Sequence, residues 1–367
     1  MKKPRILFSM PTRHHVEIAL DEMVGMQEQG YACDYFHYAA KDGVTSKTGR
    51  ASVLIQNALK LVVKCYRFKP DVIYLNSRVE RLAGMRDWLT IRIVRSLYPF
   101  KTRFVIKSHG SDLDVLRDQT SRFGKCILPY LKRKVSGWLF LSSEEKQLVV
   151  NEGLLPAAKV FVTKNIVRPE QFVKDADFKK NNSIPDDHQV LLFAGRLIAE
   201  KGVFEVVNAF SKIKDSVNAV LMIVGWGPEE DALKQLVASE HLEDRIKFTG
   251  FIQEQEMNSY YANCDVLVFP TYFPEGFPMV LFNAIASGMP VITTRQRASA
   301  DYLTQPENCL WVEPKDVDGV SKAIRMLLSS EQLQAGMKKN NQEKGKLFTK
   351  KEVCAELALI LSTIALS

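Results

Sequence analysis

The segment from Cys264 to Thr294 constrains the fold of this chain more than any other. An apolar run, Val266–Phe269, ends at Pro270, and a short loop then leads into a helical run that Gly288 closes. A second apolar run follows directly. Strand, loop, helix and strand in this order predict a βαβ unit, and such a unit requires a parallel sheet.

The loop of this unit, residues 271–278, carries Glu275 as its only charged residue, directly before the helix begins. The first turn of a helix presents unbonded backbone N–H groups and a partial positive charge. That end of the helix therefore suits a phosphate group or a sugar hydroxyl. The alternative is a buried βαβ unit in which Glu275 is only a helix cap.

Strand and helix patterns alternate through the rest of the chain, which predicts an α/β protein with two doubly wound, Rossmann-like parallel sheets facing a cleft. With 367 residues and 46% hydrophobic content, the chain is long enough for two cores. The polar stretch 174–188 interrupts the pattern and predicts an interdomain linker. We therefore expect an N-terminal domain over residues 1–180, a C-terminal domain over residues 181–348 and a last helix over residues 349–367.

Charge divides unevenly between the two halves of the chain. The net charge is +8, but residues 1–180 carry +14 and the remainder carries −6. Two amphipathic helix patterns, residues 52–68 and 84–98, hold much of the basic excess. They are explained either as solvated faces around the first sheet or as a surface that adsorbs to anionic lipid. Nucleic acid fits less well, because no recognition helix or stacking platform accompanies the charge.

Cysteine usage and hydropathy limit where the chain resides. The six cysteines are scattered and no pair has the spacing of metal ligands, which favours a reduced, cytoplasmic protein. The amino terminus has no signal-peptide pattern, and the apolar tail 357–367 is far shorter than a bilayer requires. We expect a cytoplasmic protein, with peripheral attachment to the inner face of the membrane as the further expectation.

Loops after predicted strands of the second domain carry glycines, cations and aromatic residues. In the first, Arg196 and Lys201 lie five positions apart across a turn, so both can contact one diphosphate. Taken alone, this motif is better explained as two solvated charges. The next two loops contain Trp226 and Phe251, which are more often core or rim aromatics than platforms for a stacked base.

The order of these motifs is more specific than any one of them. GRL, EKG, IVGWGP, FTGF and CDVLVFPTYFPEGFPMVLFNAIASGMPVI occur in this order. The series resembles the C-terminal domain of glycosyltransferase family 4, the retaining nucleotide-sugar enzymes of GT-B fold. The resemblance covers about residues 190–328. The first half matches more loosely, through DVIY, SHGSD, LSS and KNIV.

The resemblance implies roles for individual residues. Arg196 and Lys201 would grip the donor diphosphate, and Glu275 would bind donor-sugar hydroxyls. His109 would face the donor sugar, and the last helix would cross back to the first domain. A second glutamate is expected eight positions after Glu275, but this chain has Asn283, a neutral amide that can still bond a ribose hydroxyl. The other implied donor-binding residues are Gly195, Gly225, Phe251, Gly276, Phe277, Pro278, Val280 and Leu281.

The first loop departs from the glycine-rich turn that is common in the family. Arg13, His14 and His15 occupy it, and they indicate either sequence drift or a cationic wall on the acceptor side. Asp112 and Asp114 imitate the Asp-x-Asp metal pair of the other major glycosyltransferase fold. We expect no metal and no cofactor, because two cations already face the diphosphate.

We therefore expect a retaining, metal-independent hexosyltransferase. It would move a sugar from a nucleotide-diphosphate sugar, most simply a UDP-sugar, to a hydroxyl of a saccharide or lipid-linked saccharide in bacterial surface polysaccharide biosynthesis. A non-catalytic nucleotide-sugar-binding relative is the first alternative, because of Asn283. A nucleic-acid-binding α/β protein is the second, although we expect no nucleic-acid partner.

Overall fold

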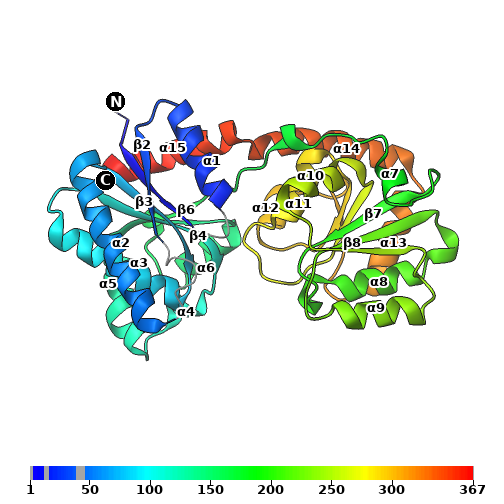
Figure 1. Cartoon of the computed structure of the whole chain (residues 1–367), viewed down its shortest axis with the longest axis horizontal. Helices are drawn as coiled ribbons and strands as arrows, with labels where there is room; N and C mark the ends of the chain where they lie inside the picture. Colours follow the sequence, from blue (N-terminus) through cyan, green and yellow to red (C-terminus); the bar gives the residue numbers. More distant parts are fainter. Residues whose placement is uncertain (1–2, 12–15, 39–45, 367) are drawn as a thin grey trace. The chain divides into compact units, whose positions relative to one another are not determined.

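The computed structural model describes residues 3–11, 16–38 and 46–366. The chain packs as two compact units, one made of residues 1–166 and 350–367 and the other of residues 167–349 (Figure 1). Within the described residues each unit contains one six-stranded sheet, and all the strand pairs are parallel. The prediction of two doubly wound parallel sheets is confirmed.

The first sheet has the strand order β2-β1-β3-β4-β5-β6. Its strands are β1 (Ile6–Met10), β2 (Cys33–His37), β3 (Val72–Val79), β4 (Arg103–Ser111), β5 (Val135–Phe140) and β6 (Val160–Val162). The helices of this unit are α1 (Val16–Glu28), α2 (Lys47–Phe68), α3 (Arg81–Leu97), α4 (Asp114–Arg117), α5 (Leu128–Lys134), α6 (Ser143–Asn151) and α15 (Lys350–Leu366).

Alternate strand residues build a separate core on each face of the first sheet, because successive side chains of a strand point to opposite faces. Leu7 and Ile73 pack with buried residues of α2, α3 and α5. Phe8 and Tyr74 pack on the other face with α1 and α15. The last helix therefore completes the core of the first unit, where it lies beside α1 (Figure 1).

The second sheet has the strand order β12-β11-β10-β7-β8-β9. Its strands are β7 (Gln189–Ala194), β8 (Ala219–Val224), β9 (Ile246–Gly250), β10 (Val266–Phe269), β11 (Val291–Thr293) and β12 (Leu310–Trp311). The helices are α7 (Phe178–Asn181), α8 (Val203–Ser211), α9 (Glu230–Ser239), α10 (Glu254–Asn263), α11 (Met279–Ser287), α12 (Arg297–Tyr302), α13 (Val317–Leu328) and α14 (Glu331–Gly345). None of the described helices is long and apolar enough to cross a membrane.

The boundary between the units differs from the sequence-based expectation. The stretch 174–188, expected as a linker, lies inside the second unit, as do residues 167–173. Phe178 is the physical reason, because it is buried and its ring contacts the ring of Tyr260 edge to face at 5.5 Å. Ile184 of the same stretch is also buried, so two apolar residues attach this polar segment to the second unit.

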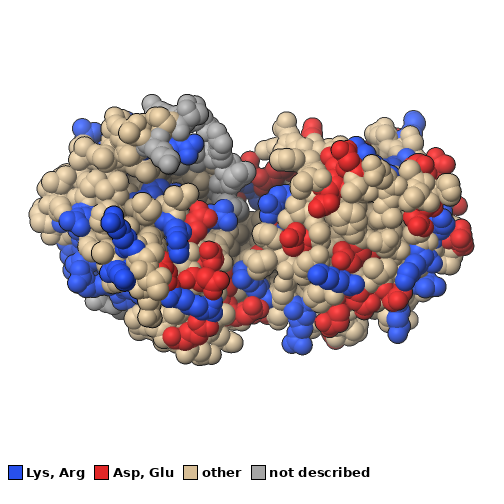
Figure 2. Space-filling view, turned by 90° about the horizontal axis from the view of Figure 1, so that it is seen from below, with Lys and Arg blue, Asp and Glu red and all other residues tan. Residues whose placement is uncertain are grey.

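The basic excess of the first half is visible on the surface. Figure 2 shows many Lys and Arg side chains on the flank of the first unit where α2, α3 and α5 lie, whereas both signs of charge are interspersed over the second unit. Beside the exposed cations Lys60 and Arg67 on α2, apolar side chains are also exposed. These are Ile55, Leu59, Val63 and Tyr66, with exposed fractions of 43–53%.

A buried ion pair joins α1 to β4 in the first unit. The ammonium of Lys107 lies 2.5 Å from Oε1 of Glu22, and neither side chain is exposed to solvent. Lys107 also donates to the backbone carbonyl of Lys164. Burial raises the pKa of the Glu22 carboxyl, against the opposing effect of Lys107. The pair stabilises the unit only while both partners are present, because a single buried charge is costly.

We predict that Lys107→Met lowers the free energy of unfolding of the first unit by about 3–5 kcal/mol, because it leaves Glu22 buried without its cation. The double variant Glu22→Leu/Lys107→Met should recover most of this loss. Denaturant unfolding followed by tryptophan fluorescence measures both. As a control, Lys346→Met removes the exposed pair with Glu343 and should cost below about 1 kcal/mol. Equal losses in the single and double variants would contradict the prediction.

Candidate active site

The candidate site lies at the point where the strand order of the second sheet reverses. Strands β7 and β10 are neighbours, and the chain leaves β7 toward β8 on one side and β10 toward β11 on the other. In open parallel sheets, ligands bind at the carboxyl ends of the strands that flank such a reversal. The segment 195–201 follows β7 and the segment 270–278 follows β10, so both enter this position.

An ion pair between the buried Lys201 and the half-buried Glu275 joins these two segments. The ammonium of Lys201 lies 2.5 Å from Oε1 of Glu275, and the side chains are 4% and 31% exposed. Burial lowers the pKa of Lys201, the nearby charge of Arg196 lowers it further, and Glu275 opposes both effects. The carboxylate of Glu275 therefore keeps the buried ammonium charged.

Arg196 belongs to the same cluster. Its guanidinium lies 5.1 Å from the ring centre of Phe273, and the Lys201 ammonium lies 4.9 Å from the same centre. One aromatic ring thus contacts both cations. Within the described chain no carboxylate pairs with Arg196, so its charge is available to an anionic ligand. The structure brings the predicted residues Arg196, Lys201 and Glu275 together.

Backbone contacts fix the two loops against each other. The amides of Tyr272 and Phe273 both donate to the carbonyl of Glu200 at 2.9 Å. Gly202, at φ +78°, allows the close approach, because a Cβ there would lie 2.5 Å from the carbonyl oxygen of Pro270. A glycine is needed for the same reason at Gly225, where a Cβ would lie 1.8 Å from the carbonyl oxygen of Gly195. The cluster is therefore held by backbone as well as by charge.

The helix α11 begins directly after this loop. Pro278 is its N-cap and provides no side-chain hydrogen bond. The side chains of Phe277 and Leu281 are buried, and the Phe277 ring stacks on Phe282 with centres 3.7 Å apart. What the turn can offer a ligand is therefore backbone N–H. The predicted donor-binding positions Gly276, Phe277, Pro278, Val280 and Leu281 all fall on this turn or the first turn of α11.

Asn283 lies one turn further along α11. Its side chain lies near the hydroxyl of Tyr261, a buried residue of α10. Burial raises the pKa of the Tyr261 hydroxyl well above its usual value, and Asn283 lowers this pKa by less, so Tyr261 is neutral. The sequence did not predict Tyr261 as the partner of Asn283, since the two residues belong to different helices.

Trp226 and Phe251 are exposed, which excludes the core and leaves the rim of the two places expected for them. Their exposed fractions are 61% and 69%, and they follow the neighbouring strands β8 and β9. The carbonyl of Trp226 accepts the amide of Leu197 at 3.0 Å, which places Trp226 beside Arg196 in the backbone. Two exposed aromatic rings on adjacent strand ends provide apolar surface next to the cationic cluster.

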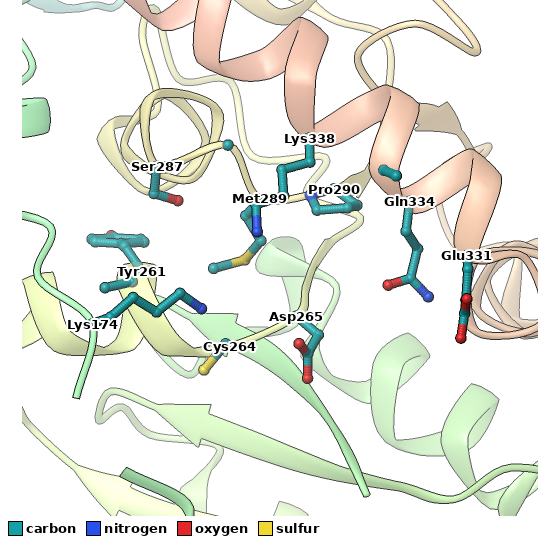
Figure 3. A pocket seen from close by; sticks show the side chains of 13 residues that line it. Lys174, Tyr261, Cys264, Asp265, Ser287, Met289, Pro290, Glu331, Gln334 and Lys338 are labelled. Carbon is teal, nitrogen blue, oxygen red and sulfur yellow. The ribbon is translucent and has the colours of Figure 1, made fainter. Parts of the chain in front are cut away.

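The opposite, amino-terminal edge of the second sheet holds a cavity that none of the sequence-predicted residues lines (Figure 3). Its charged residues include Lys174 and Asp265. It is therefore separate from the cluster around Arg196.

In the first unit, His109 lies near the carboxyl end of β4. Its Nε2 lies 2.8 Å from Oδ1 of Asn76, and the Asn76 amide nitrogen donates to the carbonyl of Ser9. That second bond identifies the amide oxygen as the acceptor, so Nε2 of His109 carries the proton. Asn76 and Ser9 were missed by sequence reasoning. The predicted acceptor-side residues Arg13, His14 and His15 lie outside the described residues.

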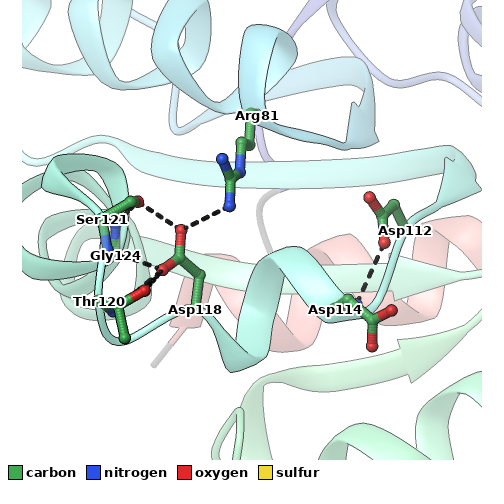
Figure 4. Close-up of polar contacts among 7 residues, drawn as sticks. All are labelled: Arg81, Asp112, Asp114, Asp118, Thr120, Ser121 and Gly124. Carbon is green, nitrogen blue, oxygen red and sulfur yellow. Dashed lines mark hydrogen bonds and ion pairs between the residues drawn. The ribbon is translucent and has the colours of Figure 1, made fainter.

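The Asp-x-Asp pair is occupied by protein contacts (Figure 4). Asp112 accepts the backbone amide of Asp114, and Asp114 pairs with Arg117 at 2.5 Å. The neighbouring Asp118 binds Arg81 and Ser121, and the Ser121 hydroxyl and amide lower the pKa of its carboxyl to about 2. Among residues 3–11, 16–38 and 46–366, no group of three or more His, Cys, Asp or Glu could hold a metal ion.

Comparison with known proteins identifies the architecture. The structure of Anabaena HepE in complex with UDP and glucose superimposes with a TM-score of 0.74 at 17% identity, over 98% of this chain and 99% of that one. A glycosyltransferase from Rickettsia africae gives a TM-score of 0.79 at 15% identity, over 99% of each chain. The chain has the GT-B fold.

The second unit also matches by sequence. Residues 174–344 match the family of glycosyl transferases group 1. An uncharacterized glycosyltransferase of Methanocaldococcus jannaschii is 29% identical over 253 residues, which cover 66% of this chain and 65% of that one. N-acetyl-alpha-D-glucosaminyl L-malate synthase of Bacillus anthracis is 27% identical over 66% of this chain and 63% of its own. The aligned region thus spans slightly less than two thirds of either relative.

We predict that Glu275→Gln strengthens the binding of UDP by about threefold to tenfold, because the diphosphate no longer competes with a carboxylate for Lys201. The family resemblance implies that Glu275 binds donor-sugar hydroxyls, so the variant should not strengthen the binding of UDP-glucose to the same extent. Isothermal titration calorimetry measures both. Glu200→Gln, a change at an exposed carboxylate of the same loop, is the control. If Glu275→Gln lowers the affinities for UDP and UDP-glucose equally, Glu275 does not compete with the diphosphate for Lys201.

The same pair predicts a pH dependence. The pKa of Lys201 is below its usual 10.5, so Lys201 loses its positive charge at a lower pH than a free lysine does. We therefore expect UDP affinity to fall as the pH rises, and to begin falling below pH 10.5. Glu275 raises this pKa, so Glu275→Gln should move the loss of affinity to lower pH. Titrations of UDP between pH 7 and 10.5 test this. If UDP affinity depends on pH in the same way in the Glu275→Gln variant, the charge of Lys201 does not control UDP binding.

Proposed function

We propose that this protein is a retaining glycosyltransferase of family 4 that uses a nucleotide-diphosphate sugar, with UDP as the nucleotide. The observation that carries the proposal is the cluster of Arg196, Lys201 and Glu275 at the strand reversal of the second sheet. Two cations on one ring suit a diphosphate, and the adjacent carboxylate suits sugar hydroxyls. HepE, which shares the fold, was solved with UDP-glucose, and this supports the choice of nucleotide.

In the proposed mechanism, the bond between the anomeric carbon and the diphosphate oxygen breaks while the acceptor oxygen attacks from the same face. Arg196 and Lys201 stabilise the charge that develops on the leaving diphosphate. The acceptor proton passes to the leaving phosphate oxygen, so no side-chain base is required. His109, whose Nε2–H is donated to Asn76, would face the donor sugar, and the exposed rings of Trp226 and Phe251 would flank the base. No metal takes part in this scheme.

The acceptor in this proposal is a hydroxyl of a saccharide or lipid-linked saccharide in bacterial surface polysaccharide synthesis. A capsular polysaccharide biosynthesis glycosyltransferase of Staphylococcus aureus is 23% identical over 79% of this chain and 76% of its own, which supports this class of acceptor. The Bacillus anthracis relative is named for L-malate, so a small hydroxy acid is the acceptor to compare first.

We predict that Arg196→Ala and Lys201→Ala each lower kcat/KM for UDP-glucose hydrolysis or transfer by about 100-fold or more, because each removes charge stabilisation of the leaving group. UDP release measures the rate, and proton NMR of the first product formed should show the donor's anomeric configuration. Lys339→Ala, an exposed lysine of α14, is the control and should not change the rate. Inversion at the anomeric carbon would overturn the retaining assignment.

Asn283→Glu separates a transferase from a non-catalytic relative. If the native protein binds UDP but neither transfers nor hydrolyses, and the variant does, then Asn283 marks a binding protein. The proposed function fails if the native protein has no affinity for nucleoside diphosphates but binds nucleic acid, and if the Arg196→Ala variant binds nucleic acid with the same affinity.

We also propose that α2 and α3 adsorb to an anionic membrane surface in the cytoplasm. The apolar residues Leu59 and Val63 of α2 and Leu82 of α3 are 44%, 53% and 78% exposed, so the core does not account for them. Exposed cations, among them Lys60 and Arg67, lie beside them. Apolar side chains among cations fit the boundary between lipid headgroups and acyl chains.

We predict that the native chain co-sediments with vesicles of phosphatidylglycerol and phosphatidylcholine and much less with phosphatidylcholine alone. Each cation at the surface contributes about 1 kcal/mol, so Lys60→Glu/Arg67→Glu should lower the partition coefficient at least tenfold. Met326→Ser, at an exposed apolar residue of α13 in the second unit, is the control. Equal sedimentation with both vesicle types would refute adsorption by charge.

A further inference from the structure

The cavity at the amino-terminal edge of the second sheet has a volume of about 260 Å³ (Figure 3). It is open to solvent on one side and is lined by the end of α10, the turn between α11 and β11, α14 and Lys174. Asp265 precedes β10 and Pro290 precedes β11, whereas Glu275 follows β10. The cavity and the proposed donor site are therefore at opposite edges of the same sheet.

The floor of the cavity is apolar and fixed. Tyr261, Cys264 and Met289 line it with exposed fractions of 4%, 6% and 3%. The amide of Met289 donates to the carbonyl of Ala284, which fixes the backbone of this part of the floor. A ligand resting here would meet a preformed surface rather than mobile side chains.

The rim is polar and carries both signs of charge. Lys174 and Lys338 provide ammonium groups, and Asp265 and Glu331 provide carboxylates (Figure 3). In the part of the chain that the structure describes, no ion pair joins these four groups. Elsewhere in the unit, exposed lysines do find carboxylates, as Lys212 does with Asp318 at 2.6 Å. Asp265 accepts the backbone amide of Val190 with one oxygen, at 2.7 Å.

This lining selects among classes of ligand. The two carboxylates disfavour the binding of a simple anion, and the two ammonium groups disfavour the binding of a metal cation. The four charges together disfavour a wholly apolar molecule. A sugar ring suits both the polar rim and the apolar floor, because each hydroxyl can donate and accept a hydrogen bond and the ring has an apolar C–H face. The volume is just below the ~300 Å³ at which small-molecule sites begin, which suits one sugar ring rather than a chain.

We propose that this cavity binds a single saccharide residue, with its apolar face on Tyr261 and Met289 and its hydroxyls between the lysines and carboxylates of the rim. In a glycosyltransferase it would hold a sugar of the acceptor or product away from the reacting centre. That use rests on the proposed function, but the binding itself does not.

Saturation-transfer NMR on the full chain tests the binding, with glucose, N-acetylglucosamine and maltose as probes at millimolar concentration. The spectra are recorded with and without UDP, so that binding at the donor site can be told apart. At least one probe should receive saturation in the presence of UDP. Lys174→Ala/Lys338→Ala should lower that signal at least fivefold, whereas Lys322→Ala/Lys339→Ala, at exposed lysines outside the cavity, should leave it unchanged.

Three results would overturn the proposal: no transfer to any probe, transfer that survives in the Lys174→Ala/Lys338→Ala variant, or loss of transfer when UDP is added. A thermal shift by inorganic phosphate that this variant alone abolishes, without sugar binding, would make the cavity an anion site instead. If the chain binds a sugar through the two lysines but has no affinity for UDP, the saccharide site is supported and the proposed glycosyltransferase function is refuted.

Discussion

The ion pair between Lys201 and Glu275 is the interaction on which the candidate site depends. An ammonium with only 4% of its side chain exposed needs a partner, and the carboxylate that provides it comes from the loop after the neighbouring strand. The pair therefore joins the two loops that follow β7 and β10, the strands that flank the reversal of strand order. In the proposed function, an incoming diphosphate would compete with Glu275 for Lys201.

The βαβ pattern around Glu275 and the alternation of strands and helices were sufficient to predict two parallel sheets, because hydrophobic runs of strand and helix length record burial directly. Arg196, Lys201 and Glu275 were predicted from motif order, and the structure brings them together. The sequence did not reveal which residues contact one another across separate elements. Such contacts depend on how the elements pack, and local sequence patterns do not record packing. Examples are Phe273 with Arg196 and Lys201, Tyr261 with Asn283, and Asn76 with His109.

The expected linker was wrong because two apolar residues of an apparently polar stretch, Phe178 and Ile184, are buried in the second unit. Composition alone does not show the tertiary context that decides burial. Trp226 and Phe251 are exposed, in agreement with a place on the rim. Exposed rings at strand ends are more informative than buried ones, since a fold does not require them there.

The placement of α15 has a consequence for the order in which the chain matures. The first unit needs Val353, Leu357 and Leu361 to complete the core between its sheet and α1, yet these residues leave the ribosome after the entire second unit. While the second unit is synthesised, α1 is the only one of the two helices on this face that is available to cover the amino-terminal sheet. Nascent chains at this stage would expose Phe8 and Met23, which makes this interval the one in which chaperones have most to bind.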